Sequence, residues 1–77
     1  MTDWEAEAKR LLKAELARSG VSYKMLAVKL EALGVNDSEA AIANRISRGK
    51  FSFVFFLQCM RALGVDEVRV AERKPRK

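Results

Sequence analysis

The sequence predicts an all-α domain, and three observations support this class. Apolar residues recur at helical spacing through most of the chain, residues that favour helix N-caps precede these segments, and glycines follow them. The chain has 77 residues, of which 49% are hydrophobic and 32% charged, so it has enough apolar side chains for one small core. We therefore expect four helices packed around a single core.

The first helix is expected to run from the start of the chain to about Ser19. In the stretch Thr2-Asp3-Trp4-Glu5, Thr2 would act as the N-cap and Glu5 would complete a capping box. Gly20 can adopt the left-handed conformation that commonly ends a helix. Helical spacing predicts a buried stripe formed by Trp4, Ala8, Leu11, Leu12 and Leu16.

The second helix is expected between Ser22, which is a good N-cap, and Gly34. Val21 precedes this cap and is placed to pack on Leu26 as a hydrophobic staple. The predicted core stripe of this helix consists of Met25, Leu26, Leu30 and Leu33.

The third helix is expected over residues 38–48. The stretch Asn36-Asp37-Ser38 favours a helix N-cap, and Gly49 follows the last turn. Ile42 and Ile46 lie about one turn apart and are predicted to form its buried side. The rest of this short helix is mostly small or polar.

The fourth helix is expected to begin at Ser52 and to end at Leu63, before Gly64. Val54 and Phe55 would point away from the core. Beyond the helix, apolar and charged residues alternate over residues 67–72, as in a half-buried strand. The chain is thus divided into a helical domain over residues 1–66 and a basic C-terminal tail over residues 67–77, with a short strand or irregular segment before a disordered end. The predicted core face of the fourth helix contains Phe53, Phe56, Leu57, Met60 and Leu63.

The amino-acid composition argues against several functional classes. The chain has no histidine and a single cysteine, Cys59, which lies in an apolar segment. The usual metal-ligand sets and nucleophile–base pairs cannot be assembled from these residues, so we expect a protein that is not an enzyme and has no cofactor. The longest apolar run, residues 53–57, is too short to cross a bilayer, and no signal-peptide pattern is present. We therefore expect a cytoplasmic protein.

Positive charge is concentrated in the second half of the chain. Residues 1–40 contain six Lys or Arg and seven Asp or Glu, whereas residues 41–77 contain nine and three, which makes the formal net charge +5. This asymmetry favours a polyanionic partner, with nucleic acid ranked first and an acidic membrane surface second. The alternative interpretation is a basic surface that serves solubility alone. Not every cation would be free, since Arg45 is expected to pair with Glu15 in the apolar stripe of the first helix.

The outward face of the third helix has the composition that suits a DNA major groove. With Ile42 and Ile46 buried, small and polar residues point outward, and no bulky apolar side chain blocks entry. Asparagine can pair with adenine, arginine with guanine, and a small residue can touch the thymine methyl group. The expected base-contacting residues are Asp37, Ser38, Ala40, Asn44 and Ser47.

Cations and backbone amides at two helix ends are expected to contact phosphates. Side chains that flank Gly49 at the end of the third helix can reach the DNA backbone, and the first amides of the second helix are unpaired and suit an anion. The alternative for the cations beside Gly49 is a solvated helix end. The expected phosphate-contacting residues are Ser22, Tyr23, Lys24, Arg48 and Lys50.

Several of these segments resemble the helix-turn-helix domains of the Cro and lambda-repressor type. The stretches SYKMLAVKLEALGV, IANRISRGK and MRALGV follow the order of that family over roughly residues 8–66. The resemblance implies a four- to five-helix lambda-repressor-like DNA-binding domain, with Arg48-Gly49-Lys50 in the loop that meets the DNA backbone. The turn after Gly34 is longer than in that family, so residues 35–38 would form an enlarged turn. On the run NRISRGKFSFVFFLQCMRALG, the chain is also similar to short prokaryotic proteins classed as a domain of unknown function.

A homodimer is expected because two large apolar side chains, Val54 and Phe55, would lie side by side on the surface. A second copy would cover them, or the tail residues Val68 and Val70 would do so within one chain. A symmetric pair would also contact twice as many base pairs as one short helix can. These four residues form the expected dimer or partner surface.

The combined prediction is a small transcriptional regulator that binds double-stranded DNA and inserts the helix over residues 38–48 into the major groove. No membrane and no small-molecule substrate are expected. The alternative is a helical protein–protein interaction module with only nonspecific affinity for nucleic acid. RNA binding ranks below both, because the aromatic residues are predicted to be buried rather than offered for stacking on bases.

Overall fold

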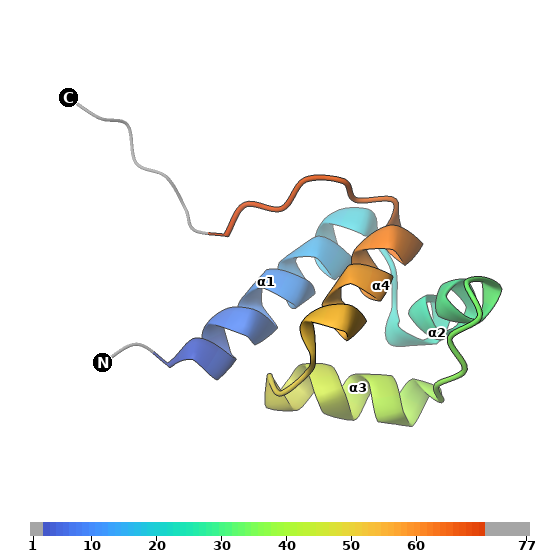
Figure 1. Ribbon diagram of the computed structural model, residues 1–77, viewed down its shortest axis with the longest axis horizontal. Helices are drawn as coiled ribbons and strands as arrows, with labels where there is room; N and C mark the ends of the chain where they lie inside the picture. The colour runs from blue at the N-terminus through green and yellow to red at the C-terminus, as the bar shows by residue number, and fades with distance from the viewer. Residues whose placement is uncertain (1–2, 71–77) are drawn as a thin grey trace.

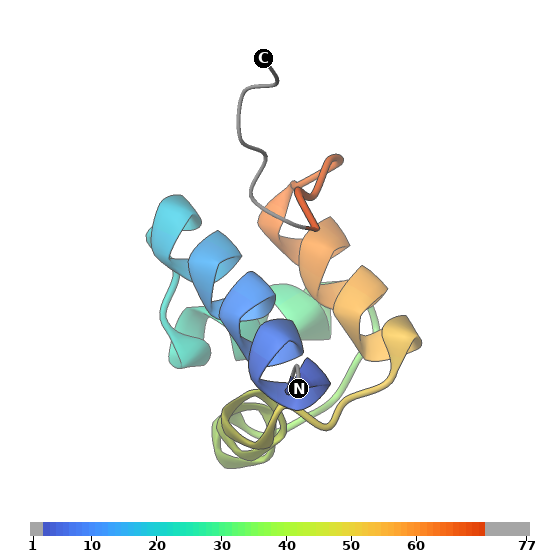
Figure 2. The same cartoon turned by 90° about the vertical axis from the view of Figure 1, so that its left-hand side faces the viewer.

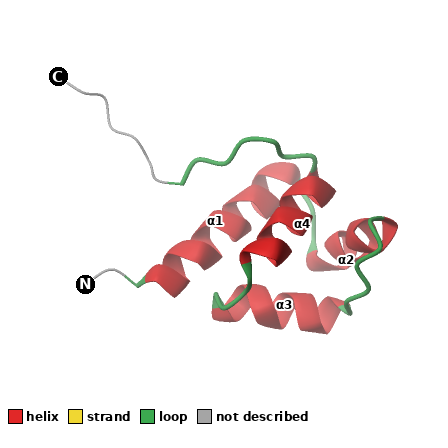
Figure 3. Ribbon diagram, viewed as in Figure 1, coloured by secondary structure: helices red, strands yellow, loops and turns green. Residues whose placement is uncertain are grey.

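The computed structural model describes residues 3–70 and contains four helices, α1 (Trp4–Ser19), α2 (Tyr23–Ala32), α3 (Glu39–Arg48) and α4 (Phe53–Leu63) (Figure 1). The predicted all-α class is therefore confirmed. Residues 65–70 form no strand, and Figure 3 shows them as a loop after α4. Of the strand expected over residues 67–72, the last two residues lie outside the described part of the chain, as does most of the basic tail.

Each helix begins at a polar N-cap whose side chain accepts a hydrogen bond from the backbone amide three residues later. Ser22 and Ser52 fill this role as expected, at 3.2 and 3.0 Å from the amide nitrogens, and in the cap-favouring stretch before α3 the residue that does so is Ser38, at 3.0 Å. The cap of α1 is Asp3 instead of the expected Thr2, and its carboxylate accepts from the amide of Ala6 at 3.1 Å. A carboxylate at this end of a helix is favoured further because it faces the positive end of the helix dipole.

The four helices pack so that each contacts two others. α1 and α4 lie side by side, and α3 crosses below them at the bottom of Figure 1. α2 packs against α3 and α4, while α1 packs against α3 and α4 from the other side. The core therefore lies in the space that all four helices enclose.

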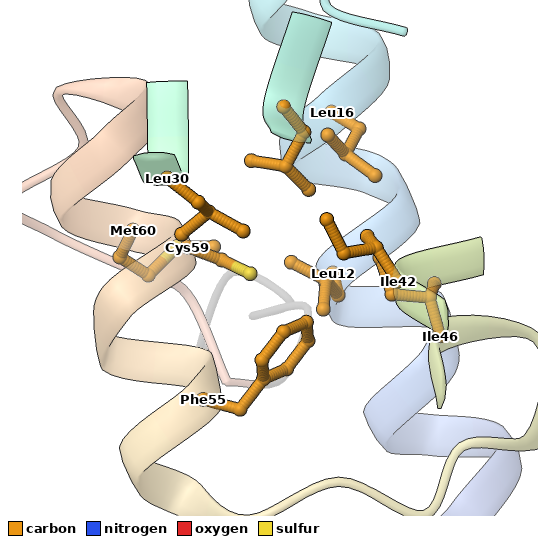
Figure 4. Packing of buried hydrophobic residues seen from close by; sticks show 9 residues of the cluster. Leu12, Leu16, Leu30, Ile42, Ile46, Phe55, Cys59 and Met60 are labelled. Carbon is orange, nitrogen blue, oxygen red and sulfur yellow. The ribbon is translucent and has the colours of Figure 1, made fainter. Parts of the chain in front are cut away.

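Nine apolar side chains form this core, and every helix contributes to it (Figure 4). The predicted positions Ile42 and Ile46 of α3 are fully buried, as are Leu26 and Leu30 of α2. The full set is Leu12, Leu16, Leu26, Leu30, Ile42, Ile46, Phe55, Cys59 and Met60.

The predicted core face of α4 is confirmed for three residues and wrong for Phe53 and Leu57. Phe55, expected on the surface, is 4% exposed, whereas Phe53 is 70% and Leu57 is 50% exposed. Figure 4 shows Phe55 and Cys59 pointing from α4 into the core, toward Leu12. The helix is apolar on almost every side, so helical spacing does not distinguish its buried face. Of the other expected core residues, Met60 is buried, and Phe56 and Leu63 are half-buried against the core.

Three other residues expected in the core are exposed. Trp4 of α1 is 75% exposed, and Met25 and Leu33 at the two ends of α2 are 47% and 48% exposed. Leu33 is the C-cap of α2 and no longer part of its last helical turn, which explains its departure from the stripe. None of the helices among residues 3–70 is long and apolar enough to cross a membrane.

Candidate nucleic-acid interface

The outward face of α3 is small and polar, as its sequence predicts. Because Ile42 and Ile46 are fully buried, the opposite side of the helix faces solvent. Ala40, Asn44 and Ser47 are all exposed there, with Asn44 directly opposite the buried pair. A surface of this kind has no bulky apolar side chain that would prevent a helix from approaching a groove.

The other two residues expected at base edges are engaged by the fold. The hydroxyl of Ser38 accepts the hydrogen bond from the amide of Ala41 that caps α3. Asp37 accepts two hydrogen bonds from the guanidinium of Arg45, at 2.6 and 3.4 Å. The Asp37 carboxylate therefore points toward α3, and a base contact by it would have to compete with this pair.

Arg45 also contacts α4, which makes it the centre of a three-part cluster. Its guanidinium carbon lies 5.1 Å from the centre of the Phe55 ring, within the range of a cation–π interaction. The expected pair between Arg45 and Glu15 is absent: Glu15 lies 3.4 Å from Arg18 instead. The reason is local, because Arg18 lies one turn away on the same helix, while Arg45 is occupied by Asp37 and Phe55.

This cluster holds one end of the enlarged turn between α2 and α3, and Val35 holds the other. The backbone amide of Val35 donates to the carbonyl of Leu30 at 2.9 Å, and the Val35 side chain packs against the core. Asp37 is held by Arg45 at the other end of the turn. The turn is thus attached to the fold at both ends, and α2 and α3 remain packed against each other.

The end of α3 presents two cations on a tightly placed loop. Gly49 has a left-handed φ of 69°, and a Cβ atom added there would overlap the backbone carbonyl of Glu5 in α1. The Lys50 ammonium lies 3.7 Å from the Glu5 carboxylate, but both side chains are more than half exposed, so this pair is weak. Arg48 is exposed and forms no ion pair within residues 3–70.

The start of α2 retains part of the expected phosphate site. Lys24 is exposed, and Tyr23 is half-buried against the core. The Ser22 hydroxyl accepts a hydrogen bond from the amide of Met25, so its oxygen caps the helix. Lys13 of α1 joins Ser22 and Tyr23 in lining a shallow hollow. The sequence analysis did not identify Lys13, which belongs to α1 and lies nine residues before Ser22 in the chain.

The single cysteine behaves as an apolar core residue. Burial raises the pKa of the Cys59 thiol from 9.0 to about 12, and the neighbouring charges of Arg45 and Asp37 act in opposite directions. The thiol therefore stays protonated near neutral pH, which makes it a poor nucleophile and metal ligand. Within residues 3–70, no group of three or more His, Cys, Asp or Glu side chains is placed to hold a metal ion.

The expected dimer or partner surface does not exist as one patch. Phe55 is buried, Val68 packs half-buried against the core, and only Val54 and Val70 are well exposed, at 61% and 72%. Exposed apolar side chains gather instead around a groove of about 570 Å³ between α1, α4 and the segment 65–70. We call this the α1–α4 groove. It is lined by Ala8, Leu11, Phe51, Ser52, Phe53, Phe56, Leu57, Met60, Val65, Asp66, Val68 and Val70.

Comparison with known proteins identifies a family but no activity. No curated protein and no solved structure matches the chain. The model of a family described as a domain of unknown function (DUF6471) matches residues 4–68, which span all four helices and most of the segment 65–70 that lines the α1–α4 groove. The match assigns no helix-turn-helix class, and it confirms the similarity expected from the run that begins at Asn44. The chain belongs to this family of domains of unknown function (DUF6471).

Proposed function

We propose that this domain is a small transcriptional regulator that binds double-stranded DNA with α3 in the major groove. The observation that carries the proposal is the outward face of α3, where Ala40, Asn44 and Ser47 are exposed opposite two buried isoleucines. An asparagine side chain can donate and accept hydrogen bonds with the edge of an adenine, and small neighbours allow it to come close. These three residues are the proposed base contacts.

Contacts to phosphates would supply most of the affinity. Arg48 is exposed without an ion pair among residues 3–70, and Lys50 is bound only weakly to Glu5. At the other end of the motif, Lys24 is exposed beside the first amides of α2, which have no partner within a helix. Lys13, which shares a hollow with the cap of α2, would add a further cation.

We further propose that α2, the enlarged turn and α3 act together as a helix-turn-helix unit of the lambda-repressor type. Two features support this proposal: α2 packs directly against α3, and the turn is attached through Val35 and Asp37. The pairing of Asp37 with Arg45 also partly neutralises a carboxylate that would otherwise repel phosphates near the start of α3.

A second candidate function is a helical protein–protein interaction module. The observation that favours it is the α1–α4 groove, whose lining is almost entirely apolar. In that case the cations would contribute only nonspecific attraction to nucleic acid. The two candidates place the decisive residues on different surfaces, so substitutions can distinguish them.

The proposal is tested by titrating the full chain against random-sequence duplex DNA at two salt concentrations and then selecting bound fragments for enrichment. Salt-dependent binding that enriches a short motif is the expected result. Asn44→Ala should weaken binding to the enriched motif by about 1–3 kcal/mol and leave binding to random DNA almost unchanged. Arg48→Ala should weaken binding to every sequence and reduce the slope of log K against log salt by about 0.9.

Arg61→Ala is the matched control for Arg48→Ala, because Arg61 also lies exposed in the last turn of a helix. It removes the same charge from α4 and should change the affinity less. Absence of binding at low salt would contradict the proposal. Equal losses in Arg48→Ala and Arg61→Ala would show that net charge, and not the α3 surface, determines binding.

A further inference from the structure

Two helices each carry an apolar stripe that lies outside the hydrophobic core. On α1, Trp4, Ala8 and Leu11 are spaced i, i+4 and i+7, so they lie on one side of the helix. On α4, Phe53 and Leu57 are one turn apart. Four of these five residues line the α1–α4 groove, and Trp4 extends the stripe toward the start of α1, where it is 75% exposed.

One wall of the groove is an ordered stack of aromatic rings. The rings of Phe51 and Phe56 are 6.4 Å apart and nearly parallel, with an angle of 7° between their planes. The rings of Phe53 and Phe56 are also 6.4 Å apart, at 19°. Phe53 is the most exposed of the three, at 70%. A large apolar side chain stabilises a protein most when it is buried, so this exposure is unfavourable in the monomer.

The segment 65–70 forms another part of the groove lining and is anchored at its start. The amide of Val65 donates to the carbonyl of Met60 at 2.9 Å, and Val68 is half-buried. Val70 lines the groove but is 72% exposed, so the segment does not close over the aromatic wall. Among residues 3–70, part of the groove therefore remains uncovered.

The charge distribution allows a second copy of this chain to be the occupant. With a formal net charge of +5, two copies repel each other over most orientations. The lining of the groove contains no Lys or Arg, and Asp66 is its only charged residue. Two copies can therefore meet at this face without bringing lining cations together, and each can bury its exposed Phe53 against the other.

The position of the groove relative to α3 supports the same occupant. Figure 2 looks toward the side where α1 and α4 lie next to each other, with the segment 65–70 above and α3 at the bottom, seen almost end-on. A two-fold axis that runs from top to bottom in this view would pair the side of one copy that carries α1 and α4 with the same side of a second copy. Both α3 helices would then lie at the same end of the dimer, where one duplex can contact both.

We propose that the α1–α4 groove is the interface of a two-fold symmetric homodimer. The argument from α3 rests on the proposed DNA-binding function, whereas the arguments from apolar exposure and charge do not. The interface replaces the patch expected around Val54 and Phe55, since Phe55 is buried and Val54 does not line the groove.

The test is sedimentation of the full chain without DNA over a range of concentrations, so that failure of DNA binding does not affect the result. The wild-type chain should be a dimer at high concentration, and Phe53→Glu should raise the dissociation constant about tenfold or more. Val54→Glu is the matched control, because Val54 is the neighbouring exposed residue and lies outside the groove. It should leave the dimer intact. Thermal unfolding of both variants checks that each one folds.

Fluorescence of Trp4, the single tryptophan, supplies a second readout. Its emission should shift to shorter wavelength as the wild-type chain dimerises and should stay constant with concentration in Phe53→Glu. A wild-type chain that remains monomeric at the highest concentration would overturn the proposal. The groove would then be a binding site for a different protein. Equal loss of the dimer in Val54→Glu and Phe53→Glu would also overturn it, because it would place the interface elsewhere on α4.

Discussion

α3 and α4 differ in how strictly their sequences determine which side is buried. In α3, Ile42 and Ile46 are the only large apolar residues, and both are fully buried, as predicted. In α4, only Gln58 and Arg61 are polar, and the predicted face was wrong for Phe53 and Leu57. A narrow apolar stripe has one way to be buried, whereas a helix that is apolar all round has several.

The same difference separates the two proposed binding surfaces. Once the narrow stripe of α3 is buried, the remaining surface is polar and suits a polar partner such as DNA. Burial of one side of α4 leaves Phe53, Val54 and Leu57 exposed, which suits an apolar partner. Excess apolar residues in a helix thus indicate a second contact surface, although they do not indicate which side forms it.

The largest expected effect tests the orientation of α4. Phe55→Ala should lower the free energy of unfolding by about 3–5 kcal/mol, because it removes a buried ring from the core. Phe53→Ala, the matched control, should change the stability of the monomer by less than about 0.5 kcal/mol, because Phe53 is mostly exposed. Urea unfolding at low protein concentration measures both. If the two variants were equally destabilised, the orientation of α4 would be wrong.

An intermediate effect is expected in the loop that joins α3 to α4. Gly20 and Gly49 both have left-handed φ values, of 67° and 69°, so alanine at either position should cost about 1–2 kcal/mol. Only at Gly49 would the added Cβ overlap the carbonyl of Glu5, which adds about 1–3 kcal/mol. Urea unfolding should therefore rank Gly49→Ala below Gly20→Ala in stability. Equal costs would mean that the loop is not held against α1.

The smallest effect concerns Arg45, which connects α3 to both the enlarged turn and α4. Arg45→Lys keeps the charge but loses the two-pronged contact with Asp37 and weakens the cation–π contact with Phe55, so it should cost about 1 kcal/mol. Arg10→Lys alters the exposed pair with Glu7 and should cost almost nothing. Thermal unfolding compares the two. No difference between them would contradict the bridging role of Arg45.

Some parts of the candidate site were predictable from the sequence, and others were not. The exposure of Asn44 and Ser47 followed from the spacing of the two buried isoleucines. The pairing of Asp37 with Arg45 was not predictable, because it depends on the path of an irregular turn. The α1–α4 groove was missed for a related reason: its lining includes Phe53 and Leu57, which have the same apolar character and helical spacing as core residues.

By itself, the sequence determined the number of helices, two of their four N-caps, the stretch that contains a third, and the polar outward face of α3, because these features depend on residues close together in the chain. Tertiary structure decided which apolar side of α4 is buried, which partner Arg45 takes, and where exposed apolar residues meet. Those outcomes depend on contacts between distant segments. Several arrangements of similar apolar side chains satisfy the same local pattern, and only the packing of all four helices selects one of them.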